Sequence, residues 1–293
     1  MIAAVQLSVS LQELQGLRSA ARQLRLGRLL QKNRSAAVGR TGPQVGRGLE
    51  FREVRSYQPG DDPRYLDWKV TARRGQPYTR VFHEEHQRPV MLFVDLASQL
   101  QFGQAGSKAV LAAKLAGVLG WSALHEKDQI GGWIETDEQS FWHPPLSTTT
   151  AFSPFLARLA SCTQALGELN PRPAGQLDAA LDDFARRLPR DSLVVLISDF
   201  VGWNQPRLLQ RLATHFPLQV LHLTDPLDQQ LPSQGGSVLL DGQVIPMTQA
   251  LRDSWAVAFT ERCRQLQSAL GYRGSYRQLS TTAAQNWLQE LMQ

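Results

Sequence analysis

Two aspartates stand at the ends of apolar runs that are far apart in the sequence. Asp95 follows the run 90–94, and Asp199 comes shortly after the run 193–197. Continuous apolar runs of this length are typical of parallel strands buried on both faces, and the carboxyl ends of such strands meet at one edge of the sheet. We therefore expect the two carboxylates to lie close together. Carboxylates placed in this way can bind a divalent cation, or they can accept hydrogen bonds from backbone amides that follow them.

A dense group of charged residues lies between residues 50 and 73. Acids and arginines alternate in it, and it also contains a tryptophan. Alternating charges on short strands favour cross-strand ion pairs and turn caps over a catalytic centre. The same arginines suit an acidic strip on a partner protein, because guanidinium groups pair bidentately with carboxylates. The residues that we predict for protein binding are Arg52, Arg55, Asp61, Asp62, Arg64, Asp67, Trp68 and Arg73.

Other patterns give little support for catalysis. Asp62 and the run 67–69 superficially resemble a metal-dependent nuclease, but these acids are too close in sequence to come from two separate strands. In the stretch 103–108 the glycines are too closely spaced for a phosphate-binding loop, and Ser precedes Lys. His83 and His86 are three positions apart, whereas zinc proteases need four on a helix face. These observations predict a protein without enzymatic activity, with a metal-dependent hydrolase acting on nucleic acid as the alternative.

The charge of the 293-residue chain is unevenly distributed. Residues 1–88 contain 16 Lys/Arg and 8 Asp/Glu, whereas residues 89–293 contain 15 and 18. A basic region can bind nucleic acid, anionic lipid or an acidic protein, and charge alone does not choose among them. The two cysteines are too few and too far apart for a disulfide framework or a zinc cluster. Because no signal peptide and no membrane-spanning run are evident, we expect a cytoplasmic protein.

Apolar periodicity predicts the elements that position these residues. Leucines at helical spacing over residues 11–30 predict an amphipathic helix that packs on the rest of the protein, with peripheral membrane attachment as the alternative. Short alternating stretches after residue 48 predict a small sheet. From residue 89 onward, apolar strands alternate with helices of about ten residues or more, which indicates a doubly wound parallel sheet. We therefore predict a basic N-terminal α+β module over residues 1–88 and an α/β domain with a C-terminal helical extension over residues 89–293.

A long motif resembles a known protein family. The segment 46–68 reads Gly-Arg-Gly-Leu-Glu-Phe-Arg-Glu-Val-Arg-Ser-Tyr-Gln-Pro-Gly-Asp-Asp-Pro-Arg-Tyr-Leu-Asp-Trp and is similar to the signature of the bacterial domain-of-unknown-function 58 family. The similarity continues through the strand ends at residues 94–95, 197–200 and 224–226. It implies a von Willebrand factor A-like domain. It also implies a chaperone-like or adaptor role beside MoxR-type AAA+ ATPases, with a protein client that the sequence does not identify.

The resemblance further implies a metal-ion-dependent adhesion site. In such sites an Asp-x-Ser-x-Ser sequence, a later Thr and a second Asp bind the cation. Asp95 and Asp199 match the two acids, and if Mg²⁺ binds they are its expected ligands. The two hydroxyl positions hold Ala97 and Gln99, and Gln176 aligns with the Thr. Two carboxylates are a poor cage for a cation that needs about six oxygens, so we expect a degenerate site with no resident cofactor.

Compared with the adhesion-site pattern, the predicted sheet-edge site has both acids but not the hydroxyl-bearing residues. A shifted loop alignment would allow Ser98 and the threonines at 148–150 to substitute for the missing hydroxyls. Taken with the basic N-terminal region, this edge predicts a protein-interaction scaffold for which nucleic acid is not the expected partner. The residues assigned to the sheet-edge site are Asp95, Ser98, Gln99, Gln176 and Asp199.

Overall fold

The computed structural model divides the chain into two compact units, residues 1–37 with 88–293 and residues 38–87. We refer to them as the α/β unit and the hairpin unit and describe each by itself. Side chains of residues 49–53 and 80–84 lie outside the described part. The residues that the structure describes are 6–22, 24, 49–84, 87–101, 103, 106–167, 172–233, 236–240, 243–272, 274–283 and 287–292.

The α/β unit is built on a six-stranded sheet with the strand order β10-β7-β6-β3-β4-β5. The first five strands of this order are parallel, and β5 is antiparallel to β4. This confirms the expected α/β fold with a mostly parallel sheet. The strands are β3 (Pro89–Asp95), β4 (Gln129–Glu135), β5 (Ser140–Leu146), β6 (Leu193–Ser198), β7 (Leu218–Thr224) and β10 (Gly274–Ser280).

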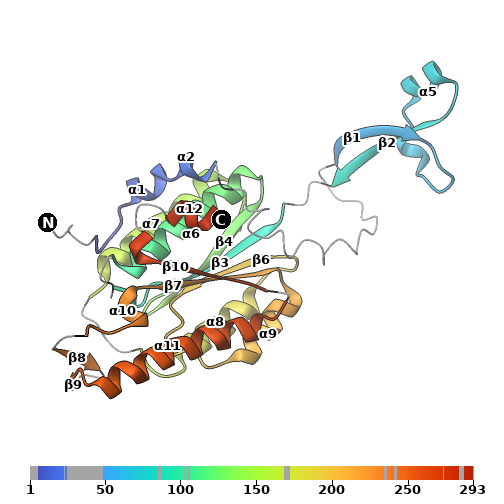
Figure 1. Ribbon diagram of the computed structural model, residues 1–293. Helices are drawn as coiled ribbons and strands as arrows, with labels where there is room; N and C mark the ends of the chain where they lie inside the picture. Colours follow the sequence, from blue (N-terminus) through green and yellow to red (C-terminus); the bar gives the residue numbers. More distant parts are fainter. Residues whose placement is uncertain are drawn as a thin grey trace. The chain divides into compact units, whose positions relative to one another are not determined.

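Helices cover both faces of this sheet, so the central strands are buried on both sides (Figure 1). In β3, Val90 and Leu92 join the core on one face while Met91 and Phe93 join the core on the other, which explains the continuous apolar run. One face carries α1 (Leu11–Gly16), α2 (Arg18–Ala21), α6 (Lys108–His125), α7 (Thr149–Ala165) and α12 (Trp287–Met292). The other carries α8 (Gln176–Arg187), α9 (Pro206–His215) and α11 (Gln249–Leu270).

Three shorter elements complete the α/β unit. The short helix α10 (Pro226–Gln229) follows β7, and β8 (Ser237–Leu240) pairs with β9 (Gln243–Pro246) as an antiparallel hairpin. Among the helices that the structure describes, none combines the length and the apolar character needed to cross a membrane.

The N-terminal helices α1 and α2 pack within the α/β unit. Leu14 and Ala21 are fully buried against α6 and α7, and the indole Nε1 of Trp121 donates to the carbonyl of Leu14 at 2.9 Å. The structure thus groups this segment with the sheet, whereas the sequence analysis placed it in one module with residues 49–88. Leu14, Ala21 and Leu24 belong to the hydrophobic core that α6 and α7 form with the sheet, and this burial fixes the segment to the α/β unit. Of the single helix predicted over residues 11–30, two short pieces are seen, and residues 25–30 lie outside the described part.

The hairpin unit consists of β1 (Leu49–Ser56) paired antiparallel with β2 (Tyr78–Glu84), with the 3-10 turn η1 (Pro63–Tyr65) and the helix α5 (Trp68–Arg74) between them. The carboxylate of Asp67 caps α5 by accepting from the amides of Lys69 and Val70, each at 3.1 Å. Gly75 ends the helix at φ 70°, a left-handed conformation that glycine adopts without strain. Both strands were predicted from sequence; α5 was not.

Candidate functional site at the carboxyl edge of the sheet

Asp95 is the last residue of β3 and is fully buried. The guanidinium of Arg172 donates to both oxygens of its carboxylate, Nη1 to Oδ2 at 3.0 Å and Nη2 to Oδ1. The hydroxyl of Ser198 also donates to Oδ2, at 2.6 Å, and the amide of Ala97 donates to Oδ1 at 3.2 Å. Burial opposes the charged form of Arg172, but the carboxylate of Asp95 outweighs it and raises the pKa of Arg172. Asp95 is therefore held as one half of a buried ion pair.

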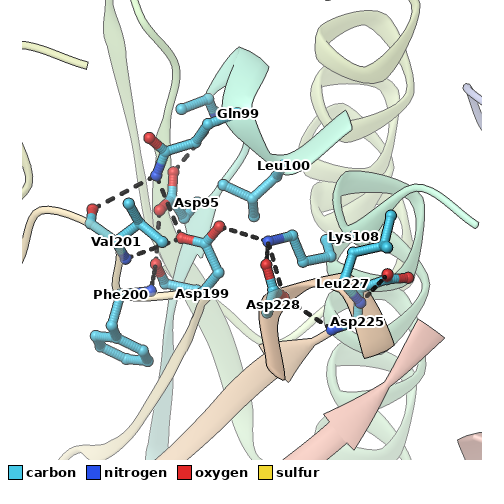
Figure 2. Close-up of polar contacts among 12 residues, drawn as sticks. Asp95, Gln99, Leu100, Lys108, Asp199, Phe200, Val201, Asp225, Leu227 and Asp228 are labelled. Carbon is cyan, nitrogen blue, oxygen red and sulfur yellow. Dashed lines mark hydrogen bonds and ion pairs between the residues drawn. The ribbon is translucent and has the colours of Figure 1, made fainter. Parts of the chain in front are cut away.

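Asp199 follows β6 and is held by a different cation (Figure 2). The ammonium Nζ of Lys108 lies 2.8 Å from its Oδ2. Its Oδ1 accepts from the side-chain amide of Gln99 at 3.2 Å and from the backbone amide of Val201 at 3.0 Å. Burial acts to raise the pKa of Asp199, but the positive charge of Lys108 outweighs it and lowers this pKa to about 2. Asp199 is consequently ionised at any physiological pH.

Lys108 bridges Asp199 to a third acid, Asp228 of α10 (Figure 2). Its Nζ lies 3.1 and 3.2 Å from the two carboxylate oxygens of Asp228, and its side chain is only 2% exposed. Burial acts to lower the pKa of Lys108, but the two carboxylates more than offset this and raise it. A cation in the first turn of a helix opposes the helix dipole, so the two acids are what make Lys108 tolerable at the start of α6.

The registers of the sheet bring these acids to one edge. Val94 is paired with Ile197 in the neighbouring strand, and Ile197 is paired with Leu221 in the next, so β3, β6 and β7 end at the same level. The contact between Ser198 and Asp95 then places Asp199, the next residue, beside the Asp95 pocket. The structure thus brings Asp95 and Asp199 to one carboxyl edge.

The residues at this edge do not fit a divalent cation. Both oxygens of Asp95 and both oxygens of Asp199 already accept hydrogen bonds, and each acid carries a buried cationic side chain as its main partner. An added cation would have to displace these positive groups, and Ala97, Gln99 and Gln176 stand where an adhesion site has its hydroxyl ligands. Within the described ranges, no group of three or more His, Cys, Asp or Glu is arranged to hold a metal ion.

The other predicted sheet-edge residues occupy varied positions. Gln99 contacts Asp199, but Ser98 and Gln176 contact Asp137, in the turn after β4. The amide of Ser98 donates to Oδ2 of Asp137 at 2.8 Å, and Nε2 of Gln176 donates to its carbonyl at 3.1 Å. Both residues therefore help to shape the rim of this edge.

His222 of β7 contacts the backbone of Asp199. Its Nε2 is 3.1 Å from the carbonyl oxygen of Asp199, and its Nδ1 is 2.7 Å from the hydroxyl of Tyr276. Burial, reinforced by the charge of Arg262, lowers the pKa of His222 to about 3. Phe200, which packs against this imidazole, has a φ of 54°, an uncommon conformation for a bulky residue and one that recurs at functional loops.

The residues predicted for protein binding all belong to the hairpin unit, but their contacts differ. Arg55 pairs with Asp61 at 2.7 Å, and Arg64 pairs with Asp62 at 2.6 Å, so these charges satisfy one another. Asp67 caps α5. The side chains of Trp68 and Arg73 are exposed, and that of Arg52 lies outside the described part.

Sequence reasoning missed three residues of the ion pairs at this edge: Lys108, Arg172 and Asp228. Lys108 falls in the stretch that was compared with a phosphate-binding loop and set aside. Asp228 could have been found, because Asp-Pro-Leu-Asp at residues 225–228 is a capping sequence directly after a strand. Arg172 lies in a connecting loop, where no periodicity marks its role.

Comparisons with known proteins agree with the motif found in the sequence. A family model described as "Protein of unknown function DUF58" matches residues 53–262. Uncharacterized proteins from Mycobacterium bovis and Mycobacterium tuberculosis are 31% identical to this chain over 222 residues, which cover 73% of the chain and 68% of each relative. An uncharacterized Bacillus subtilis protein, YeaD, is 41% identical over 66 residues, 22% of this chain and 16% of the relative.

Two solved structures from Bacteroides species match this chain with low similarity. The hypothetical protein BatB of Bacteroides thetaiotaomicron has 14% identity and a TM-score of 0.40, covering 70% of this chain and 97% of that protein. An aerotolerance-related membrane protein of Bacteroides fragilis has 17% identity and a TM-score of 0.41, covering 70% and 98%. Because the family model covers more than half of the chain and the mycobacterial relatives are 31% identical to it, the chain belongs to the DUF58 family of proteins of unknown function.

Proposed function

We propose that this protein is a non-enzymatic docking adaptor whose carboxyl edge contacts a partner without a bound metal ion. In this proposal the α/β unit is a von Willebrand factor A-like domain in which Arg172 and Lys108 provide the positive charge that a cation provides in a metal-dependent adhesion site. The observation that carries the proposal is the pairing of each edge acid with a buried cation of the chain itself.

The same pairing argues against catalysis at this edge. A general acid or base works best when its pKa lies near the operating pH. Asp199 has a pKa of about 2 and is hydrogen-bonded at both oxygens, while His222 has a pKa of about 3 and contacts at both ring nitrogens. Neither group is poised to take or give a proton at neutral pH, so a rigid, charge-satisfied edge suits recognition better than chemistry.

The partner that we propose is a MoxR-type AAA+ ATPase in the cytoplasm, acting with a protein client. Its support is the family resemblance of the signature segment. The alternatives have less support. The nuclease reading needs Asp62 free for a metal ion, yet this carboxylate is paired with Arg64. The membrane reading needs an exposed apolar face on the N-terminal helix, yet Leu14 and Ala21 are buried.

A binding experiment with the purified ATPase of the same organism tests this proposal. We expect the full chain to bind it equally well in EDTA and in Mg²⁺. The double variant Glu138→Arg/Asn204→Arg changes two exposed side chains near the carboxyl edge and should weaken binding. The control Arg190→Glu changes an exposed residue just before β6, at the opposite edge, and should not. Binding that disappears in EDTA, or equal losses in both variants, would contradict the proposal.

A further inference from the structure

The hairpin unit has no apolar core among the side chains that the structure describes in it. Over residues 54–79 only Asp67 and Thr79 are buried, at 8% and 4% exposure, and both are polar. A two-stranded hairpin is marginal by itself, and units of this size usually need help from a larger surface. A binding partner is one source of such a surface.

Trp68 is the most prominent apolar side chain of the hairpin unit. It is 70% exposed, although tryptophan is usually well buried. Its backbone is fixed, because Asp67 caps the helix that it begins and Gly75 ends that helix about two turns later. A rigidly held, exposed tryptophan is the kind of residue that dominates protein interfaces.

The cations of the hairpin unit differ in what they contact. Arg55 and Arg64 are each paired with a carboxylate of the same unit. The cations of α5 are exposed, and they form no ion pair with any described residue: Lys69, Arg73 and Arg74. Arg74 instead lies over the ring of Tyr78, 5.3 Å from its centroid. The helix α5 is therefore a small surface with one tryptophan and three cations that lack a carboxylate partner in the part of the chain that the structure describes.

From this surface we infer that α5 is a docking element for an acidic segment of a partner protein. Carboxylates of that segment pair with Lys69, Arg73 and Arg74, and an apolar notch beside them receives the ring of Trp68. A nucleic acid is disfavoured by overall charge: the hairpin unit, residues 38–87, contains 9 Lys/Arg and 7 Asp/Glu, so its positive excess is small, whereas binding to phosphate backbones needs a strong positive excess.

This inference rests on the proposed adaptor function and names the chemistry of one of its contacts. With the purified ATPase as the probe, we expect Trp68→Ala to weaken binding about tenfold or more. We expect Arg73→Glu/Arg74→Glu to weaken it at least as much, with a smaller difference at high salt. The control Arg22→Glu/Arg190→Glu has the same charge change on exposed residues of the α/β unit away from its carboxyl edge and should stay within about twofold of the wild type. Equal binding by the α5 variants and the control would overturn the inference and leave the adaptor function standing.

A second measurement decides the inference even if the ATPase does not bind, which would instead defeat the proposed partner. A photo-cross-linking benzoylphenylalanine at Ala72, an exposed position on α5, is activated in the native cell, and the cross-linked peptides are sequenced. We expect peptides in which Asp and Glu outnumber Lys and Arg, and loss of these cross-links when Trp68→Ala is added. Cross-links to basic peptides or to nucleic acid, or none at all, would overturn the inference.

Discussion

The guanidinium of Arg172 makes a bidentate ion pair with the carboxylate of Asp95, although 77 positions separate the two residues in the sequence. The guanidinium is only 3% exposed, so both charges are buried and each depends on the other. A planar guanidinium fixes the direction as well as the distance of such a pair. The pair therefore involves the first acid of the degenerate adhesion site that the family resemblance implies, and it makes the edge a fixed part of the fold.

The first prediction concerns this ion pair. Arg172→Met should lower the free energy of unfolding by about 3–5 kcal/mol, because Asp95 would remain as a buried charge without a cation. Urea unfolding followed by circular dichroism measures the change. Arg186→Met is the matched control: its guanidinium also contacts carboxylates but is exposed, so its loss should stay below about 1 kcal/mol. Similar losses of unfolding free energy in the two variants would contradict the prediction, because the buried pair would then stabilise the fold no more than an exposed one.

The second prediction concerns the cation shared by two acids. Lys108→Met should also cost about 3–5 kcal/mol at neutral pH, since Asp199 and Asp228 would both be buried without it. Without the lysine, burial and mutual repulsion raise the pKa of these acids in the folded state, so stability is regained as they take up protons below their folded pKa. The loss of unfolding free energy relative to the wild type should therefore be smaller at pH 4.5 than at pH 7. A penalty independent of pH would contradict this account, and adding Asp199→Asn should restore part of the loss.

The third prediction is a pH dependence that comes from His222. Its pKa is lowered to about 3 in the folded protein from an ordinary value of 6.5, so the unfolded chain takes up a proton first as the pH falls. Stability from this residue is complete above pH 6.5 and is lost toward pH 3, with a slope of up to about 1.4 kcal/mol per pH unit. Urea unfolding between pH 7.5 and 5 measures that slope. His222→Gln should flatten it whatever its effect at pH 7, and an unchanged slope would show that His222 is not the cause.

How far the sequence could predict these features depends on where the determining contact lies. The strand from Val90 to Val94 was predictable because burial on both faces requires an unbroken apolar run. The edge strand β5 was missed because it contains Pro144 and Pro145, which remove amide donors and are tolerated only where pairing is one-sided. The Arg172 contact was missed for a different reason: it is a long-range side-chain pair, and local patterns carry no information about which loop reaches which strand end.

The fourth prediction tests the assignment of the N-terminal helices to the α/β unit. Leu14→Ala should lower the free energy of unfolding by about 2–5 kcal/mol, because Leu14 is fully buried against α6 and its removal leaves a cavity. Leu7→Ala is the control, since Leu7 is 58% exposed and should change stability by no more than about 0.5 kcal/mol. The same variants sedimented with anionic vesicles separate the two interpretations of this helix. Vesicle binding by the wild type that Leu14→Ala abolishes would favour membrane attachment instead.

The central claim, that the chain's own cations take the place of a divalent ion at the carboxyl edge, is tested most directly by calorimetric titration of the full protein with Mg²⁺ and Mn²⁺. We predict no saturable binding in the millimolar range, and the same flat titration for Asp95→Asn. One equivalent bound by the wild type and lost in Asp95→Asn would contradict the claim, because it would mean that Arg172 leaves its carboxylate to admit a metal ion.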